Sequence, residues 1–348
     1  MMKWIATLLS TIALLALPAL PVAAHHPNPV RAAIDAGADR LVDLQNADGG
    51  WFFTVGDADC GLGAGVSCPN TFGITALGLA DAYPVTHDGD QINAAIRAAN
   101  ALIAKHGAAP ACDGNPATSA DRPFTVDATF LTDISHIGRV GKIVGSAAKK
   151  NYRKVARDWF ECVMADFPSA AARANNRIDG RIAQGLDNLG AWDASLDVRA
   201  ALDVDEKSYA LAEALQIIAR APDWDVADPQ CVGCETLSKG LFLAATEELR
   251  HNTAIKNARN LWKAQLLAAQ LPDGSWNGDT QITAYVVMGL VESHIDKNTR
   301  KALNAGVAFL MSQQLPNGGF DTGFGDEVTE VDAEAVQALV AAKRFDDD

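Results

Sequence analysis

Arginine recurs at every fourth position in one segment of the chain, at Arg173, Arg177 and Arg181. On a helix this spacing puts the three guanidinium groups on one face, with Asp179 close by. A guanidinium group can hold a carboxylate or a sulfate through two parallel hydrogen bonds. The stripe therefore indicates one of two things. It is a cleft for an acidic polymer, where arginine would neutralise a uronic acid for a lyase, or it is a solvated helix face.

A basic run precedes this stripe. Seven basic residues and no acidic residue lie between Arg139 and Arg157, although the whole chain has a formal net charge of −14. The run leaves the same two alternatives open, because it fits either a cleft for an anionic polymer or the exposed face of an outer helix.

The cysteines indicate disulfides rather than metal binding. An even number of cysteines in an exported chain is typical of disulfide bonding. A single Cys-x-x-Cys without a second pair is a poor zinc signal, so we expect no metal and no cofactor. The expected pairs are Cys60–Cys68, Cys112–Cys162 and Cys231–Cys234.

Three segments that could position such residues share a glutamine, a glycine turn and an aromatic ring. They are Gln45–Trp51, Gln270–Trp276 and Gln314–Phe320. Each follows one helical stretch and precedes another, so they are expected to be the corners of a repeated helical hairpin. The glutamine amide can bond groups left free at a helix end, glycine accepts a positive φ, and the ring can pack over the turn.

Helices dominate the remaining sequence. Alanine and leucine recur at three- and four-residue spacing, strand signals are sparse, and no linker divides residues 25–348. We therefore expect a single all-α domain. The twelve predicted helices span residues 32–44, 71–82, 91–105, 126–137, 152–165, 177–189, 206–219, 236–249, 253–269, 280–293, 298–311 and 331–343.

The three corners resemble the QW-type repeats of the terpenoid cyclase and protein prenyltransferase superfamily. The helical segments 280–290 and 331–339 are also similar to the inner helices of that superfamily. The resemblance implies an α/α toroid of about six helical hairpins in two concentric rings, with the inner helices around a cavity. It does not imply one activity, because this fold hosts cyclases, prenyltransferase subunits and polysaccharide lyases.

In such a toroid, polar residues on the helices that follow each corner become candidate functional groups. Helix capping accounts for acidic residues at these positions equally well. The ligand-binding candidates are Asp127, Asp133, Asp179, Asp279, Gln281, Glu330 and Asp332. The catalytic candidates are His136, Arg177, Arg181, Asp203 and Asp205.

The segment Asp203-Val-Asp205-Glu206 resembles the Asp-x-Asp-Asp motif of class II terpene cyclases. The resemblance implies that the central acid, here Asp205, protonates an alkene, for which it must be kept neutral and desolvated. The segment departs from the motif at its last residue. An acidic helix start is the structural alternative.

The first 24 residues have the pattern of a signal peptide. Lys3 supplies the charged start, residues 5–20 form an apolar run too short to span a bilayer comfortably, and Val22-Ala23-Ala24 is a small-residue cleavage site. We therefore expect an exported protein, periplasmic or secreted, without a membrane span after cleavage. The acidic charge argues against nucleic acid as a partner.

Together these observations predict an exported α/α-toroid protein, acting as a monomer, that binds a ligand in its central cavity. The expected ligand is a small molecule or polymer, either a lipid or isoprenoid or a polysaccharide. A lyase acting on uronic-acid polysaccharides and a class II-type terpene cyclase are the two alternatives. No motif in the sequence establishes catalysis.

Overall fold

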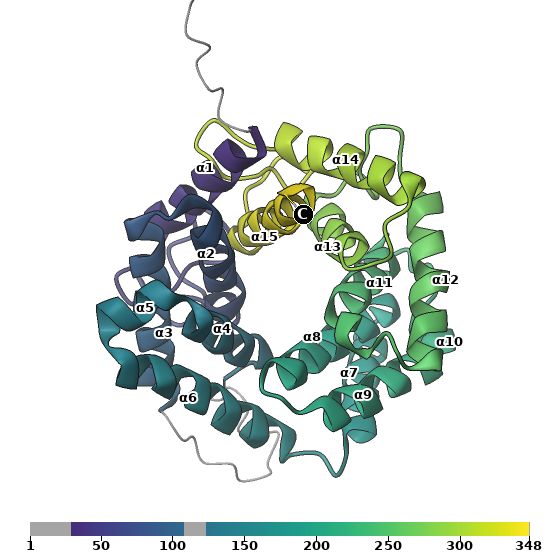
Figure 1. Ribbon diagram of the computed structural model, residues 1–348, viewed down its shortest axis with the longest axis horizontal. Coiled ribbons are helices and arrows are strands. Elements are labelled where there is room, and N and C mark those ends of the chain that lie inside the picture. The colour runs from purple at the N-terminus through teal and green to yellow at the C-terminus, as the bar shows by residue number, and fades with distance from the viewer. Residues whose placement is uncertain (1–28, 108–122, 348) are drawn as a thin grey trace, which may run out of the picture.

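The polypeptide forms a closed ring of paired helices (Figure 1). The computed structural model describes residues 29–107 and 123–347. Each of six inner helices contacts the next, and the last contacts the first. The inner helices are α2 (Phe72–Thr86), α4 (Thr125–His136), α8 (Gly190–Asp203), α11 (Cys234–Ala245), α13 (Thr280–Val291) and α15 (Thr329–Asp347).

Six further helices surround the inner ring, and each precedes an inner helix in the chain. They are α1 (Pro29–Asp43), α3 (Gly89–His106), α6 (Ser146–Met164), α9 (Lys207–Ala219), α12 (Thr253–Ala269) and α14 (Lys297–Ser312). The remaining helices are α5 (Gly138–Val144), α7 (Ala170–Ala183) and α10 (Ala221–Trp224), and α7 packs against both α8 and α9. The predicted toroid of two concentric rings is confirmed.

The glutamine of each corner makes the same pair of hydrogen bonds. The Nε2 atom of Gln45 donates to the carbonyl oxygen of Gly49 at 2.9 Å and to that of Ala94, in the next outer helix, at 2.9 Å. Gln270 and Gln314 repeat both bonds in their own corners. One side chain therefore holds the turn and ties neighbouring outer helices together.

The last of these bonds closes the ring. Gln314, at the end of α14, donates to the carbonyl oxygen of Ala33 in α1 at 2.9 Å. Arg40 of α1 also forms an ion pair with Glu327, in the loop before α15, at 2.7 Å. The first and last hairpins are thus joined by polar contacts as well as by packing of α1 against α15.

The aromatic ring of each corner is buried under the turn. The indole Nε1 of Trp51 donates to the Leu41 carbonyl oxygen at 2.8 Å, and that of Trp276 donates to Leu266 at 2.7 Å. Phe320 is fully buried at the third corner without such a donor. The aromatic ring therefore stabilises the corner mainly by packing, and the indole hydrogen bond adds to this in the two corners that have tryptophan.

The corner glycines meet two demands at once. Gly274 and Gly318 have φ values of 93° and 96°, in the region that other residues enter only with strain. A side chain on either would also collide with a backbone carbonyl of the neighbouring outer helix, at Ala305 or Ala36. The glycines thus allow both the reversal of the chain and the close packing of adjacent hairpins.

The structure contains helices that the sequence analysis did not predict, and one of them, α8, belongs to the inner ring. Within the described residues there are fifteen α-helices rather than twelve, and the prediction missed α5, α8 and α10. It also placed a helix at 177–189, whereas α7 ends at Ala183. Helix α8 was missed because Asp193, Asp197 and Asp203 interrupt its apolar periodicity.

Two predicted disulfides are confirmed. Cys60 pairs with Cys68 and Cys231 with Cys234, with Cα atoms 5.3 and 5.5 Å apart. The third predicted pair is untested because Cys112 lies outside the described residues, as does the predicted signal segment 1–24. Among the described helices, none has both the length and the apolar content that crossing a bilayer requires.

Candidate functional site

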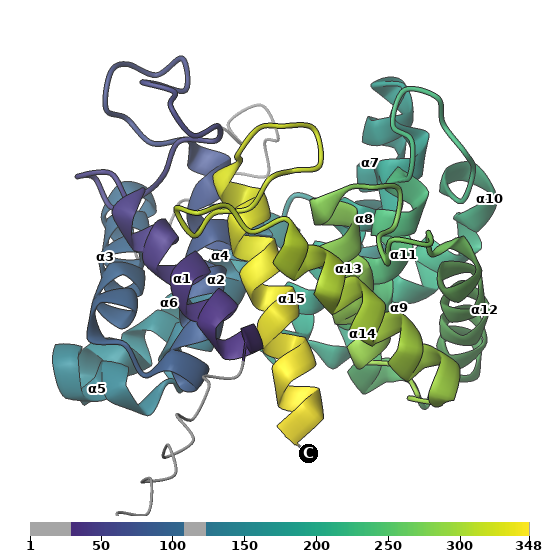
Figure 2. The same cartoon turned by 90° about the horizontal axis from the view of Figure 1, so that it is seen from above.

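The ring has a cavity at each end. The first turns of α2, α4, α8 and α15 line one of them, which we call the amino-mouth cavity. The last turns of α8, α11, α13 and α15 line the other, which we call the carboxyl-mouth cavity. Figure 2, a view from the side, shows longer loops gathered at the end of the ring where the inner helices begin.

The loops at the amino mouth are tied to one another. Backbone and side-chain hydrogen bonds connect neighbouring loops around most of the rim, and both described disulfides lie in these loops. A fixed rim is expected where loops position functional groups. The bonded pairs are Phe53 with Thr329, Thr280 with Thr322, Val232 with Asn277, and Asn188 with Cys231.

The amino-mouth cavity has a volume of about 440 Å³ and a mixed lining. Such a volume is in the range of ligand-binding pockets. Planar polar side chains come from Asn70, Asn176, Arg177, Arg181, Gln184 and Asp193. Apolar surface comes from Ile74, Phe124, Val126, Trp192 and Leu196.

A fully buried aspartate is shared by two of the three arginines of α7. The Nε atoms of Arg173 and Arg177 both donate to Oδ2 of Asp197 at 2.9 Å, and Nη2 of Arg177 reaches Oδ1 at 3.0 Å. Thr125 donates its hydroxyl to Oδ1 at 2.9 Å. Burial alone would raise the pKa of Asp197, but Arg177 and Arg173 hold it at about 2. Asp197 is therefore a permanent anion.

A second pair lies nearer the opening of the cavity. Nε of Arg181 donates to Oδ2 of Asp193 at 2.6 Å, and Nη2 donates to Oδ1 at 3.1 Å. The guanidinium carbon of Arg181 is 5.9 Å from the centre of the Trp192 ring. This contact positions the indole as a flat wall of the cavity.

Glu330 is the one charged side chain of this lining, among the described residues, that has no ion pair. It is the second residue of α15 and is only 8% exposed. Burial raises its pKa to about 7. One turn later, Glu334 accepts a hydrogen bond from the Tyr285 hydroxyl at 2.6 Å. Burial is the main cause that raises the pKa of Glu334 well above the ordinary value, and the nearby Glu330 raises it further. Glu330 can therefore exchange a proton near neutral pH.

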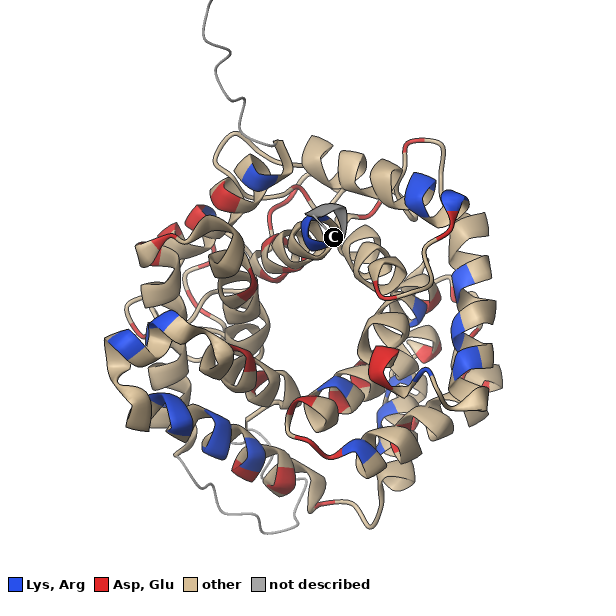
Figure 3. Cartoon of the chain, in the orientation of Figure 1, with Lys and Arg blue, Asp and Glu red and all other residues tan. Residues whose placement is uncertain are grey.

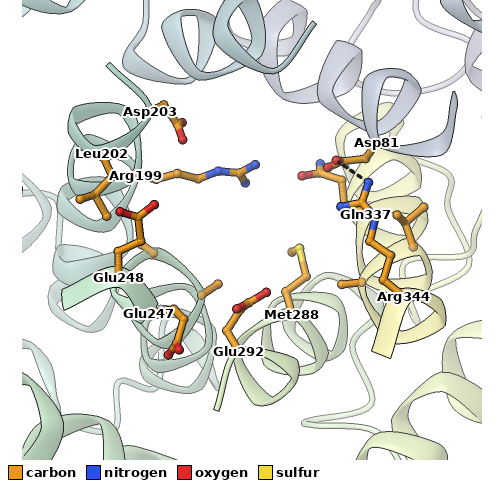
Figure 4. Close-up of a pocket in the computed structure, with 14 residues that line it drawn as sticks. Asp81, Arg199, Leu202, Asp203, Glu247, Glu248, Met288, Glu292, Gln337 and Arg344 are labelled. Carbon is orange, nitrogen blue, oxygen red and sulfur yellow. Dashed lines mark ion pairs between the residues drawn. The ribbon is translucent and has the colours of Figure 1, made fainter. Parts of the chain in front are cut away.

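The carboxyl-mouth cavity has a volume of about 310 Å³. Figure 4 shows Arg199 reaching from α8 across this cavity, with Asp81 and Arg344 paired on the far side at 3.6 Å. Arg199 also forms an ion pair with Asp133 of α4 at 3.4 Å. Burial raises the pKa of Asp203, on the cavity wall, to about 6.

Comparison with protein-family models and with curated proteins gives no match. Solved structures do match. A variant of the type II terpene cyclase MstE from Scytonema, in complex with geranylgeranyl dihydroxybenzoate, has a TM-score of 0.59 at 16% identity, covering 91% of this chain and 98% of that chain. The fold is the terpenoid-cyclase-like α/α toroid.

Other toroidal enzymes share this fold. A possible member of the GH105 family from Klebsiella pneumoniae has a TM-score of 0.58 at 12% identity, covering 97% of this chain and 100% of that chain. A GH76A α-1,6-mannanase from Salegentibacter has a TM-score of 0.55 at 12% identity, covering 91% and 99%. At these identities the likeness shows the fold alone.

The toroid divides the catalytic candidates between its two ends. Arg177 and Arg181 lie at the amino mouth. Asp203 and His136 lie at the carboxyl mouth, in adjoining depressions. Asp205 lines neither cavity: it is exposed, has a φ of 69° and pairs with Arg153 at 2.7 Å. The structure therefore does not bring the two aspartates of the 203–206 segment to one site.

Three ligand-binding candidates hold backbone amides instead of facing a cavity. Asp279 caps α13 by accepting from the amide of Ile282 at 2.9 Å. Asp127 accepts from Phe124 at 2.8 Å, and Asp332 accepts from Phe320 at 2.6 Å. Their carboxylates are therefore engaged in the turns that start inner helices.

The other ligand-binding candidates fall in different places. Asp133 lies at the carboxyl mouth beside Arg199, and Glu330 lies at the amino mouth. Asp179 is exposed on α7 and pairs with Arg220 at 2.7 Å. Gln281, in the first turn of α13, lies beside Glu334 and does not line the amino-mouth cavity.

The basic run from residue 139 to 157 lies on α5 and α6, at the outside of the ring (Figure 3). Lys154 pairs with Asp158 on the same helix at 2.6 Å, and Arg157 donates to the carbonyl oxygen of Val204 at 2.5 Å. The solvated outer helix is therefore the alternative that the structure supports.

The sequence alone did not single out Trp192, Asp193, Asp197 or Arg199, all of which lie on the missed helix α8. One signal was available. The four-residue spacing of Asp193 and Asp197 matches that of the arginines, as expected for two antiparallel helices with complementary charges.

Proposed function

We propose that this protein is exported and binds a hydroxyl-rich ligand, such as the end of a glycan, in the amino-mouth cavity, where Glu330 exchanges a proton with it. The observation that carries the proposal is the buried and unpaired carboxyl group of Glu330 in a cavity whose other charged side chains are paired. A carboxyl group with a pKa of about 7 is suited to general acid–base catalysis near neutral pH.

The lining of the cavity supports a glycan. Planar amide, guanidinium and carboxylate groups can make several hydrogen bonds at once, which suits neighbouring hydroxyl groups. The Trp192 ring offers an apolar wall for the face of a sugar. The α-1,6-mannanase and the possible GH105 member are toroids of the same fold. A polyprenyl chain would leave the polar lining without partners, which is costly.

A uronic-acid lyase is a second candidate. Nη1 of Arg177 has no hydrogen-bond partner among the described residues, and Arg177 lines the cavity. It could therefore contact a ligand carboxylate. The class II cyclase hypothesis has less support because Asp205 lies outside both cavities.

Replacing Glu330 with glutamine tests the proposal. The variant is expected to keep ligand affinity within about threefold and to lose at least about 100-fold in turnover, since the amide retains the shape but exchanges no proton. Binding would be measured by calorimetry with α-1,6-mannan, oligogalacturonate and alginate fragments. Turnover would be followed through new reducing ends, and ultraviolet absorbance would reveal a lyase.

The matched control is Glu161→Gln, the same change at an exposed position of the outer helix α6. Unchanged turnover in the Glu330 variant would reject its catalytic role. Binding of a geranylgeranyl compound in place of every glycan would reject the ligand class.

The proposed export can be tested through cleavage of the signal peptide. Protein recovered from its own host is expected to begin at His25, because cleavage should follow Ala24. N-terminal sequencing would check this, and Ala24→Glu should block processing because the site requires a small residue. An intact Met1 in cytoplasmic protein would contradict the proposal.

A further inference from the structure

The carboxyl-mouth cavity carries an excess of negative charge. Five acidic and two basic side chains line it in the described part of the chain. The inner helices end here, and the carboxyl ends of helices add partial negative charge. The acids are Asp81, Asp203, Glu247, Glu248 and Glu292, and the bases are Arg199 and Arg344.

Only some of these acids have partners within the protein. Glu247 pairs with Arg259 at 2.7 Å, and Glu248 pairs with Lys207 at 2.8 Å in an exposed position. Glu292 forms no ion pair with any described residue, although its carbonyl oxygen accepts a hydrogen bond from Arg259. One carboxylate oxygen of Asp203, Oδ2, is buried without a hydrogen-bond partner in the described part of the chain. Glu292 is thus an exposed carboxylate at this mouth, whereas Asp203 keeps a buried oxygen without a partner, although buried carboxylate oxygens are normally hydrogen-bonded.

A buried amide faces the same space. Gln337 of α15 lines the cavity, is only 5% exposed and makes no hydrogen bond with a described residue. Figure 4 shows Asp203 and Gln337 on opposite sides of the cavity. An unpartnered amide that is nine-tenths buried indicates a missing hydrogen-bonding group in the cavity.

Apolar atoms complete the lining. Leu202, Met288 and Val340 contribute hydrocarbon surface between the polar groups. A ligand that satisfies this cavity therefore needs cationic groups joined by an aliphatic body. Its size is limited, because the volume of about 310 Å³ lies at the lower end for ligand pockets.

We infer that the carboxyl-mouth cavity binds a small aliphatic diamine, whose two ammonium groups pair with Asp203 and Glu292, which lie apart on its wall, and whose stem contacts Met288. The site lies at the opposite end of the ring from Glu330, so the inference does not depend on the proposed function. Burial holds the pKa of Asp203 at about 6, and a bound cation would lower it.

Calorimetry on the mature protein tests the inference, with cadaverine as the probe. Cadaverine is expected to bind at least about tenfold more tightly than pentanediol, which has the same length but no charge, because charge-assisted hydrogen bonds supply the difference. Glutarate, which reverses the charge, should not bind. The affinity for cadaverine should also fall as salt is added.

Glu292→Gln is expected to weaken cadaverine binding about tenfold, because it removes one charge from the cavity. Asp57→Asn is the matched control, since it removes one charge from an exposed loop at the amino mouth. Glu292 is exposed, so its variant should fold even where Asp203→Asn does not. Gln337→Met should also weaken binding, while an Asp57 variant should bind as the parent does.

Equal binding of cadaverine and pentanediol would overturn the inference, as would equal effects of the Glu292 and Asp57 variants. Failure of all glycan binding with cadaverine binding intact would instead reject only the proposed function. Lysine carries a carboxylate as well as ammonium groups. If it binds more than about tenfold more tightly than cadaverine, Arg199 binds the ligand carboxylate and the ligand is not a simple diamine.

Discussion

Asp197→Ala is expected to lower the free energy of unfolding by about 3–5 kcal/mol, the range found when one partner of a buried ion pair is removed. The aspartate is fully buried and accepts from Arg173, Arg177 and Thr125. Its loss leaves two guanidinium groups without a counter-charge in the wall between α7 and α8. Urea denaturation followed by circular dichroism would measure the change.

The control is Asp179→Ala, which removes an exposed aspartate of α7 from its pair with Arg220 at a helical backbone position where alanine fits. Exposed pairs contribute about 0–1 kcal/mol, so this variant should unfold almost as the parent does. Similar losses in both variants would show that the buried cluster is no more important than a surface pair.

The pH dependence of stability provides a second test of Asp197. Its pKa is lower in the folded state, at about 2, than the value of about 3.9 for an unfolded chain. Stability from this group is therefore fully present above about pH 4 and is lost as pH falls towards 2. The parent should lose more stability over this interval than Asp197→Ala, which lacks the group.

Trp276→Ala is also expected to destabilise the toroid by about 3–5 kcal/mol, the cost of removing a large buried ring. The ring is 1% exposed and fills the second corner. Trp276→Phe should cost only about 1–2 kcal/mol, because it loses the indole bond to the Leu266 carbonyl but keeps most of the volume.

The third corner of the same chain supports this difference, since Phe320 occupies the equivalent position. Phe324→Ala is the matched control, because that ring is 74% exposed and its loss should change stability by less than about 0.5 kcal/mol. Denaturation midpoints would rank the three variants. Equal losses in the alanine and phenylalanine variants of Trp276 would assign the stability to the hydrogen bond instead of the packing.

The corners made the fold predictable. A glutamine, a glycine turn and a ring at fixed spacing report a local structure that repeats, and each of the three forms the same bonds. Two of the three expected disulfides could also be assigned from proximity in sequence. Local patterns of this kind can be recognised in a sequence because the interacting residues lie a few positions apart or in the next repeat.

The site was harder to predict because its pairs join distant elements. The arginine stripe was visible in the sequence, but its partners lie on α8. The inward-facing aspartates of α8 interrupt the apolar repeat by which a buried helix is normally recognised. Proximity in sequence misled in the case of Asp203 and Asp205. The chain reverses direction at the positive φ of Asp205, so the two side chains face different surroundings.

The closed ring has a further consequence. Helix α1 packs against α15, and the bond from Gln314, at the end of α14, to Ala33 of α1 joins the last hairpin to the first as the equivalent bonds join consecutive hairpins. The position of the chain ends is therefore not essential to the architecture. A circular permutant, with its original ends linked and a new opening at another corner, should adopt the same ring, and no hairpin needs to serve as a terminal cap.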